Sequence, residues 1–259
     1  MSTLPSPPFI TVDGVHNFRA LLLPNSQSAI LYRSASPAQI TPAGIKTLHS
    51  LNVTTIFDLS SSPEIEKRKA AGDTLYIEGI ERVHAPVFAE QNYSPESIAL
   101  RFKNYAGTDT TAGFVKAYTE ILESGAPAFT QALEFLRDKP SEKCLVHCSA
   151  GKDRTGILCA LILLLVGVPD GAVADEYALT THGLAEMKEE IVERILKNEA
   201  LKGNREGAER MLGSKRETMM ASIEMIEREY GGAEGYVRVK CGMREGDLNV
   251  IRESITKRG

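Results

Sequence analysis

The sequence predicts an α/β fold in which a mainly parallel sheet is flanked by helices and followed by a helical C-terminal third. Strand-like runs at residues 29–35, 53–57 and 82–86 alternate with stretches of helical character. Strands that alternate with helices build right-handed βαβ units, and such units form a parallel sheet. Beyond residue 169, strand-like runs give way to segments with apolar residues at helical spacing.

The composition fits one globular domain over residues 1–259. A chain of 259 residues buries a sizeable core, and it contains no internal repeat and no linker. The net charge of −4 argues against a nucleic-acid-binding protein. It leaves an acidic substrate open, because a local cluster of positive charge can still attract one. The sequence does not indicate the oligomeric state.

Three features indicate a cytoplasmic protein without a transmembrane segment. Residues 1–8 lack the basic and apolar regions of a secretory signal. The longest apolar run, residues 157–168, is too short to span a bilayer. The four cysteines show neither a zinc-site spacing nor a disulfide framework, so a reducing compartment fits best.

Local signals assign the elements in chain order. Residues 9–12 are a short strand candidate, and the strand at 29–35 follows. Thr41-Pro42 and Ser62-Pro63 are both helix starts with proline at the first helical position. Beyond the third strand, the pattern predicts helices at residues 95–105, 112–124, 126–139, 157–168, 169–181, 183–200, 214–230 and 245–257. Gly125 separates the second and third of these, and Gly231-Gly232 ends the seventh.

The most informative stretch is Val146-His147-Cys148-Ser149-Ala150-Gly151-Lys152-Asp153-Arg154-Thr155-Gly156. An apolar strand candidate precedes it and an apolar helix follows it. The loop between them, residues 148–154 (the anion loop), therefore opens onto a helix N-terminus, where free N–H groups and the helix dipole attract an anion. Its glycine and small residues let the backbone N–H groups turn inward as a nest.

Two side chains of the anion loop have the chemistry of a phosphoryl-transfer site. The field that attracts phosphate also stabilises a thiolate, so Cys148 is a candidate nucleophile on the floor of the loop. The guanidinium of Arg154 can bind two oxygens of a phosphate at once. A structural cysteine beside a surface arginine is the alternative, but the whole run of motif positions between strand and helix favours the phosphatase interpretation.

The run His-Cys-x-x-Gly-Lys-Asp-Arg-Thr-Gly resembles the motif of the cysteine-dependent protein tyrosine phosphatase superfamily, and specifically of the bacterial and fungal tyrosine/serine phosphatase family. The stretches Tyr32-Arg33-Ser34-Ala35 and Phe57-Asp58-Leu59 are similar to further landmarks of that family. The resemblance implies a phosphatase-type α/β fold without cofactor or metal and a phosphorylated protein or phosphoinositide as substrate. It also implies the following roles: a phosphocysteine at Cys148, phosphoryl binding by Ser149, Ala150, Gly151, Lys152, Asp153 and Arg154, assistance to the thiolate by Thr155, and support of the loop by His147.

The chain departs from the family pattern at two places. Ser60 stands where the family has an arginine after the Asp-Leu pair, so a cation for a second phosphate is missing and activity on phosphoinositides is in doubt. Residues 20–24 replace the glycines of the family's first hairpin. Residues 88–113 are either a surface excursion or a lid over the active site, and we favour the lid because related enzymes carry a helical lid at this place.

The general acid is the least determined of the predicted roles. The chain has no tryptophan and therefore no Trp-Pro-Asp loop. Asp153 lies in the anion loop, and Asp58 ends a strand that reaches the same rim if the strands are parallel. Neighbouring cations favour the ionised form of Asp153, whereas Asp58 shows no cationic neighbour in the sequence. We favour Asp153, because a general acid must first lie within reach of the leaving oxygen and only then have a suitable pKa. Asp109 is the next residue to test.

The sequence also contains a lysine in the anion loop and four isolated histidines. Lys152 is either a second cation for the phosphate or a solvated charge of the loop. His16, His49, His84 and His182 have no partners at metal-ligand spacing, so no metal is expected.

Two functions compete with a phosphatase: a catalytically silent phosphate-binding module, and another thiolate enzyme such as a sulfurtransferase or arsenate reductase.

Overall fold

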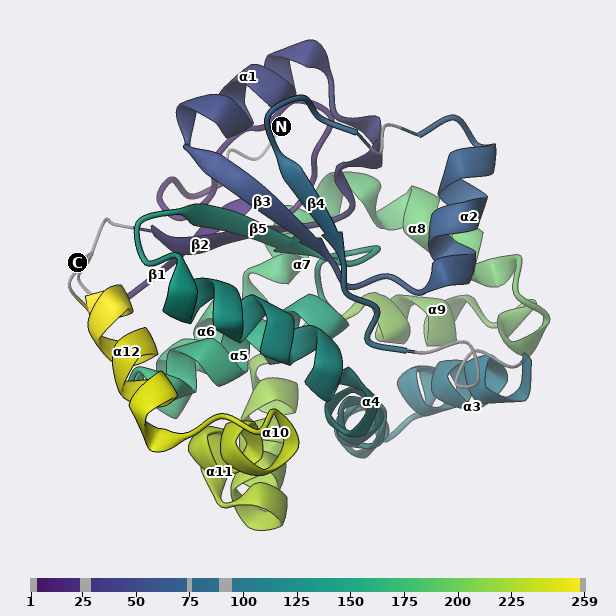
Figure 1. Ribbon diagram of the computed structural model, residues 1–259. Helices are drawn as coiled ribbons and strands as arrows, with labels where there is room; N and C mark the ends of the chain where they lie inside the picture. Colours follow the sequence, from purple (N-terminus) through teal and green to yellow (C-terminus); the bar gives the residue numbers. More distant parts are fainter. Residues whose placement is uncertain (1–3, 24–28, 74–75, 89–94, 257–259) are drawn as a thin grey trace.

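The computed structural model describes residues 4–23, 29–73, 76–88 and 95–256, and within them five strands form one sheet (Figure 1). The strands are β1 (Arg19–Leu22), β2 (Ala29–Ser34), β3 (Val53–Asp58), β4 (Glu81–His84) and β5 (Lys143–His147). Their order across the sheet is β1-β2-β5-β3-β4. Strands β2, β5, β3 and β4 are parallel, and β1 pairs antiparallel with β2 at the edge. The predicted mainly parallel α/β sheet is confirmed.

The register brings three strand ends together. Ser34 at the end of β2 and Asp58 at the end of β3 are both paired with His147 at the end of β5. The chain that leaves β5 therefore emerges between the carboxyl ends of two other parallel strands, which is where α/β sheets bind their ligands.

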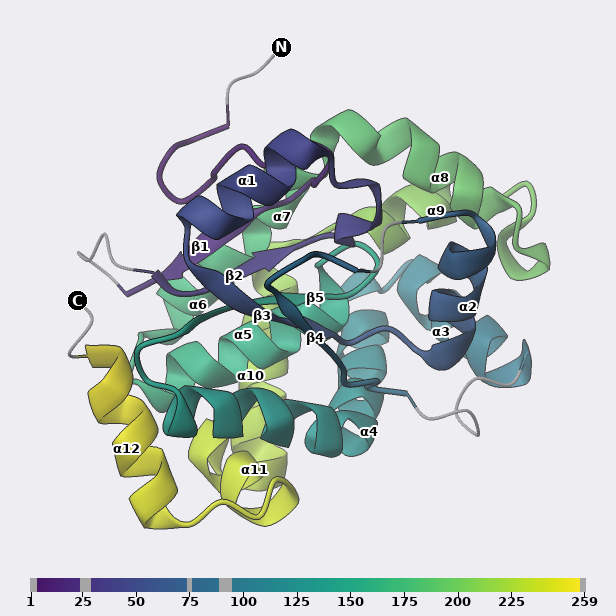
Figure 2. The same ribbon diagram turned by 45° about the horizontal axis from the view of Figure 1, so that its top comes forward.

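Helices cover both faces of the sheet and dominate the second half of the chain. They are α1 (Pro42–Ser50), α2 (Ser62–Ala70), α3 (Pro95–Ala106), α4 (Thr110–Asp138), α5 (Asp153–Leu165), α6 (Asp170–Ala178), α7 (Thr180–Gly183), α8 (Lys188–Leu196), α9 (Arg205–Leu212), α10 (Arg216–Tyr230), α11 (Gly232–Lys240) and α12 (Glu245–Thr256). Helix α1 lies on one face of the sheet, whereas α4, α5 and α6 lie on the other with α10, α11 and α12 outside them (Figures 1 and 2). Both views place α2, α3, α8 and α9 around the end towards which the parallel strands point.

Helix α1 starts at Thr41-Pro42 as predicted, whereas the cap of α2 is Ser61, one residue before the predicted Ser62-Pro63 start. The Thr41 hydroxyl accepts a hydrogen bond from the Gly44 N–H at 3.2 Å, and Pro42 opens α1. At the start of α2, a Glu64 carboxylate oxygen accepts the Ser61 N–H at 2.9 Å, as in a capping box. This cap fixes Glu64 in the first turn of α2, at the rim of the sheet.

Helix α5 is a core helix, as its sequence predicts. Residues 157–163 are all at most 2% exposed, so the helix is apolar on every side rather than amphipathic. It belongs to the larger of the hydrophobic clusters, together with residues of α4, α6, α10, α11 and α12. A helix packed on all sides holds its N-terminus, and hence the anion loop, in one position.

The prediction of two helices separated at Gly125 is wrong, because α4 runs unbroken from Thr110 to Asp138. Pro127 also lies inside it. Glycine costs about 1 kcal/mol and proline about 3 kcal/mol inside a helix. The apolar stripe outweighs these costs because it continues across the junction: Leu122, Gly125, Ala126, Ala128 and Phe129 are all buried.

The C-terminal third is helical, but its predicted boundaries need correction. The predicted helix at 183–200 is a series of short pieces: the end of α7, a 3-10 turn at Ala185–Met187, α8, and a second turn at Glu199–Leu201. Helices α9 and α11 were not predicted, since each is short and carries few apolar residues. Residues 9–12 form isolated bridges in place of a full strand. The end of α10 at Gly231, with φ of 73°, is as expected.

Candidate active site

The anion loop connects β5 to α5 and turns tightly beneath β2. Gly151 has a positive φ of 64°, and a Cβ atom at this position would lie 2.0 Å from the Ser34 carbonyl oxygen. No residue other than glycine fits that contact. The Ser36 N–H donates to the Ser149 carbonyl at 3.1 Å, so the segment after β2 holds the loop on the same side.

Two side chains, one just before β1 and one from β2, bind the loop carbonyls. The Asn17 side-chain amide donates to the carbonyl oxygens of Ala150 at 3.1 Å and of Gly151 at 3.3 Å. The Arg33 guanidinium donates to the Gly151 carbonyl at 2.8 Å. Because these carbonyls are turned towards Asn17 and Arg33, the N–H groups of the loop are free to face the opposite side, as an anion-binding nest requires.

A buried ionic cluster fixes these side chains. Glu176 of α6 pairs with Arg19 at 2.7 Å and with Arg33 at 2.5 Å, and Arg19 also donates to the Asn17 side-chain oxygen at 2.5 Å. Burial alone would lower the pKa of Arg33, but Glu176 reverses this and raises it. Burial would likewise raise the pKa of Glu176, yet the two arginines lower it. The cluster is therefore ionised, and each arginine faces the Glu176 carboxylate, as buried charges require. Within the described residues, the buried Nε of Arg33 is left without a hydrogen-bond partner.

Cys148 lies on the floor of the loop, with 2% of its surface exposed. Two predicted supporting residues lie on either side of it in sequence: His147 directly precedes Cys148, and Thr155 lies in the first turn of α5. A His147 ring nitrogen, Nδ1, lies 3.2 Å from the Cys148 carbonyl oxygen. The Thr155 hydroxyl is buried and has no hydrogen-bond partner within the described part of the chain, so it has no competing bond that would keep it from a thiolate.

Arg154 reaches across the mouth of the loop to α2. Its two terminal nitrogens lie 2.6 Å and 2.9 Å from the Glu64 carboxylate oxygens, and the Ser149 hydroxyl donates to the same carboxylate at 2.5 Å. Burial alone would raise the pKa of Glu64, but Arg154 and Ser149 hold it well below its usual range. Glu64 is thus a carboxylate bound to two groups that the sequence assigns to phosphate.

Asp153 sits at the start of α5 and is held from the side of the protein core. The Tyr118 hydroxyl of α4 donates to its Oδ1 at 2.8 Å, and the Lys152 ammonium lies 3.4 Å from the same oxygen. Its side chain keeps 24% exposure. Asp153 therefore combines a fixed orientation with access to solvent, both of which a proton donor to a substrate needs.

Lys152 is buried rather than solvated, so its interpretation as a solvated loop charge is wrong. Its ammonium donates to the carbonyl oxygens of Met211 and, at 3.2 Å, of Gly213, and it lies 4.7 Å from the centre of the Phe114 ring. Burial lowers its pKa, which Asp153 opposes. The ammonium ties the anion loop to the connection between α9 and α10, which leaves the backbone N–H of Lys152 as its candidate phosphate contact.

Asp58 reaches the predicted rim but has two cationic neighbours that the sequence did not reveal. Its carboxylate pairs with Arg68 at 2.9 Å and with Arg82, and it accepts the Ser60 N–H at 3.0 Å. Burial alone would raise the pKa of Asp58, but His147, Arg68 and Arg82 lower it far below its usual range. Burial lowers the pKa of His147 to about 4, so at neutral pH the arginines are the charged partners. An acid held ionised in this way is poorly suited to donate a proton.

The comparison with known proteins gives one decisive result. Residues 10–257 match the tyrosine phosphatase family. The chain belongs to this family. It is 30% identical over 149 residues to a tyrosine-protein phosphatase of Nostoc commune, an alignment that covers 56% of this chain and 49% of that protein. It is 25% identical over 252 residues to the triple specificity protein phosphatase PtpB of Mycobacterium tuberculosis, covering 86% of this chain and 89% of PtpB. The chain thus spans about half the length of the first relative and most of the second.

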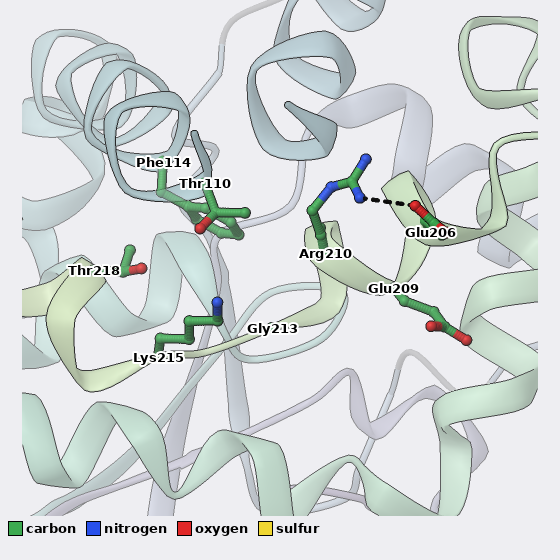
Figure 3. Close-up of a pocket in the computed structure, with 8 residues that line it drawn as sticks. All are labelled: Thr110, Phe114, Glu206, Glu209, Arg210, Gly213, Lys215 and Thr218. Atoms are coloured by element: carbon green, nitrogen blue, oxygen red, sulfur yellow. Dashed lines mark hydrogen bonds and ion pairs between the residues drawn. The ribbon is translucent and has the colours of Figure 1, made fainter. Parts of the chain in front are cut away.

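Figure 3 shows a concave region of this tyrosine phosphatase family member. A cavity of about 360 Å³ lies between α4, α9 and α10, with Phe114 on one side and Arg210 and Lys215 on another. Arg210 pairs with Glu206 at 3.5 Å. Gly213 also lines the cavity and accepts the Lys152 ammonium. Cys148 is not among the residues that line the cavity, and the lining side chains carry charges of both signs.

Within the described residues, no group of three or more His, Cys, Asp or Glu side chains is placed to hold a metal ion. No helix in this part of the chain has the length and apolar character needed to cross a membrane. None of the four cysteines, all of which the structure describes, is in a disulfide.

Several residues of the site were not assigned roles from the sequence. They are Asn17, Glu64, Tyr118 and Glu176. The Ser-x-x-Glu pattern of the capping box was visible at Ser61 and Glu64, but it signals a helix start and not an arginine partner.

Proposed function

We propose that this protein hydrolyses phosphomonoesters, with phosphotyrosine in proteins as the principal substrate. The observation that carries the proposal is the anion loop with Cys148 on its floor, Arg154 at its mouth and its carbonyls bound from behind by Asn17 and Arg33. Such a loop presents fixed dipoles to a phosphate, and it costs little reorganisation when charge develops in the transition state.

The reaction has two displacement steps. The Cys148 thiolate attacks phosphorus, the bond to the leaving oxygen breaks, and Asp153 supplies the proton that this oxygen takes. Arg154 and the loop N–H groups bind the three remaining phosphoryl oxygens. Water then attacks the phosphocysteine, Asp153 takes its proton, and the sulfur–phosphorus bond breaks to return the thiolate and release phosphate.

The relatives support a broad rather than a narrow choice of phosphorylated residue. One is named a tyrosine-protein phosphatase and the other a triple specificity protein phosphatase. Phosphoserine and phosphothreonine are therefore the second candidate substrates. Phosphoinositides are less favoured, because the buried Ser60 supplies no charge for a second phosphate.

The test is hydrolysis of p-nitrophenyl phosphate with and without vanadate, using Cys148→Ser as the control. The wild type should turn over and vanadate should inhibit it, whereas Cys148→Ser should lose turnover but still bind tungstate, because its alcohol stays protonated. A silent phosphate-binding module would bind tungstate without turnover in either protein. Cys148→Ser with a substantial share of wild-type kcat would disprove covalent catalysis at this residue. Phosphotyrosine peptides, phosphoserine peptides and short-chain phosphoinositides then rank the substrates.

Residues 88–113 act as a lid in this proposal. The support is that the ring centre of Tyr105 in α3 lies 5.6 Å from the Lys152 ammonium of the anion loop. Residues 89–94 lie outside the described part of the chain. The chain works as one domain, supported by a core cluster that joins α4 and α5 to the C-terminal helices. A reducing compartment such as the cytoplasm suits an enzyme whose nucleophile is a thiol.

A further inference from the structure

A line of two tyrosine hydroxyls leads from the core to Asp153. The Tyr118 hydroxyl of α4 lies 2.8 Å from Asp153 Oδ1 and 2.6 Å from the Tyr177 hydroxyl of α6. Tyr118 has one hydroxyl hydrogen, and an ionised carboxylate can only accept. Tyr118 therefore donates to Asp153, and Tyr177 donates to Tyr118.

We propose that Tyr118, supported by Tyr177, is the positioning residue of the general acid. It binds Asp153 Oδ1, so that the catalytic proton is carried by the other oxygen, Oδ2. This inference rests on the proposed function and adds a residue to it. An acid that is fixed in rotation presents its proton to the leaving oxygen without paying the entropy of finding that orientation.

The groups around Asp153 are consistent with this division between its two oxygens. Lys152 lies 3.4 Å from Oδ1, the oxygen that Tyr118 also binds. Arg154 follows Asp153 in the loop and is bound to Glu64 of α2. The ring centre of Tyr105 in α3 lies 5.6 Å from the Lys152 ammonium. Burial raises the pKa of Tyr105, Tyr118 and Tyr177, so their hydroxyls stay protonated while the enzyme works.

Packing alone does not require a hydroxyl at position 118. The Tyr118 ring packs edge-on against two other rings, with distances between ring centres of 5.8 Å to Phe114 and 6.3 Å to Tyr177. Tyr118 is fully buried in the largest core cluster. A phenylalanine would fill the same volume and keep these ring contacts. A buried hydroxyl needs a partner, and this one has two, Asp153 in the anion loop and the Tyr177 hydroxyl.

The test compares Tyr118→Phe with the wild type on phenyl phosphate, which has a poor leaving group, and on p-nitrophenyl phosphate, which has a good one. For Tyr118→Phe we expect kcat/KM to fall about tenfold or more on phenyl phosphate and no more than about twofold on p-nitrophenyl phosphate. Tyr236→Phe is the matched control, because its buried hydroxyl also donates a single bond, to the Leu122 carbonyl at 2.6 Å, away from the loop. The ratio of its kcat/KM to that of the wild type should be the same on both substrates.

A double variant tests whether Tyr118 acts through Asp153. In the Asp153→Asn background, Tyr118→Phe should have almost no further effect on phenyl phosphate. Equal losses on both substrates, no loss on either, or an additive loss in the double variant would each overturn the proposal while leaving the proposed function intact. A wild type that hydrolyses neither substrate would instead overturn the proposed function, and this inference with it. Equal tungstate affinity in Tyr118→Phe and wild type checks that the loop is folded.

Discussion

Glu64 and Arg154 form a two-pronged ion pair across the mouth of the anion loop, with nitrogen–oxygen distances of 2.6 Å and 2.9 Å. The residues are 90 positions apart and come from the first turns of α2 and α5. The carboxylate binds the same guanidinium nitrogens and the same Ser149 hydroxyl that a phosphate would approach. A phosphoryl dianion must therefore bind next to a carboxylate or displace it, and either event costs electrostatic energy.

Glu64→Gln should tighten the binding of tungstate and phosphate. The substitution removes the like charge, and glutamine can still serve in the capping box. We expect the inhibition constants at pH 7 to fall about tenfold, or about 1.4 kcal/mol. The unfolding free energy should drop by about 1 to 2 kcal/mol because a largely buried ion pair is lost. Glu66→Gln, in an exposed pair with Lys69 on the same helix, is the control and should change neither quantity. Weaker oxyanion binding in Glu64→Gln would mean that Glu64 aligns Arg154 instead of competing with phosphate.

Arg154→Lys should lower kcat/KM strongly, even though the positive charge is retained. Lysine keeps the charge but loses the planar pair of donors that matches two phosphoryl oxygens. We expect kcat/KM on p-nitrophenyl phosphate to fall about a thousandfold, about 4 kcal/mol of transition-state stabilisation. Arg216→Lys, in an exposed pair with Asp175, should stay within about twofold of the wild type. Near-normal kinetics for Arg154→Lys would contradict the role of the guanidinium in the loop.

The parts of the site that are contiguous in sequence were predictable, and the parts that depend on distant contacts were not. Residues 146–156 carry the strand, the loop and the helix start in one stretch, so local rules predicted the anion loop. The parallel register then placed Arg33 and Asp58 at the same rim. The partners of Asp153 and Gly151 come from positions 35 and 134 residues away, Tyr118 and Asn17, and no local pattern signals them.

The same distinction explains the errors. Asp58 was expected to lack cationic neighbours because Arg68 and Arg82 are remote in sequence; one helix and one strand bring them to it. Gly125 was expected to break a helix because intrinsic propensity was weighed without the packing that surrounds it. In both cases, tertiary contacts that the sequence does not display decided the outcome.

His147 should make the protein less stable below neutral pH. Burial lowers its pKa from 6.5 to about 4, so the unfolded chain binds a proton at a higher pH than the folded chain does. Its contribution is complete above about pH 6.5 and is lost as the pH falls towards about 4. Between pH 7.5 and 5, the loss should be about 2 kcal/mol.

Urea unfolding at a series of pH values measures this contribution. His147→Asn should be less stable at pH 7.5, but its unfolding free energy should change less over the same range. His182→Asn removes an exposed histidine and should keep the wild-type slope. The same slope in His147→Asn and wild type would show that other groups cause the acid sensitivity.

The choice of general acid between Asp153 and Asp58 leads to opposite results for their asparagine variants. Asp153 is partly exposed beside the loop and is held by one tyrosine, whereas Asp58 is fully buried between two arginines that keep it ionised. Asp153→Asn should therefore lose most activity on phenyl phosphate, little on p-nitrophenyl phosphate, and the basic limb of its pH–rate profile. Asp58→Asn should keep that limb and lose about 3 to 5 kcal/mol of stability instead, because it removes the buried carboxylate that pairs with Arg68 and Arg82. If Asp58→Asn loses the limb and Asp153→Asn retains it, the assignment is reversed. If both retain it, the acid lies elsewhere, and Asp109 at the start of α4 is the next residue to substitute.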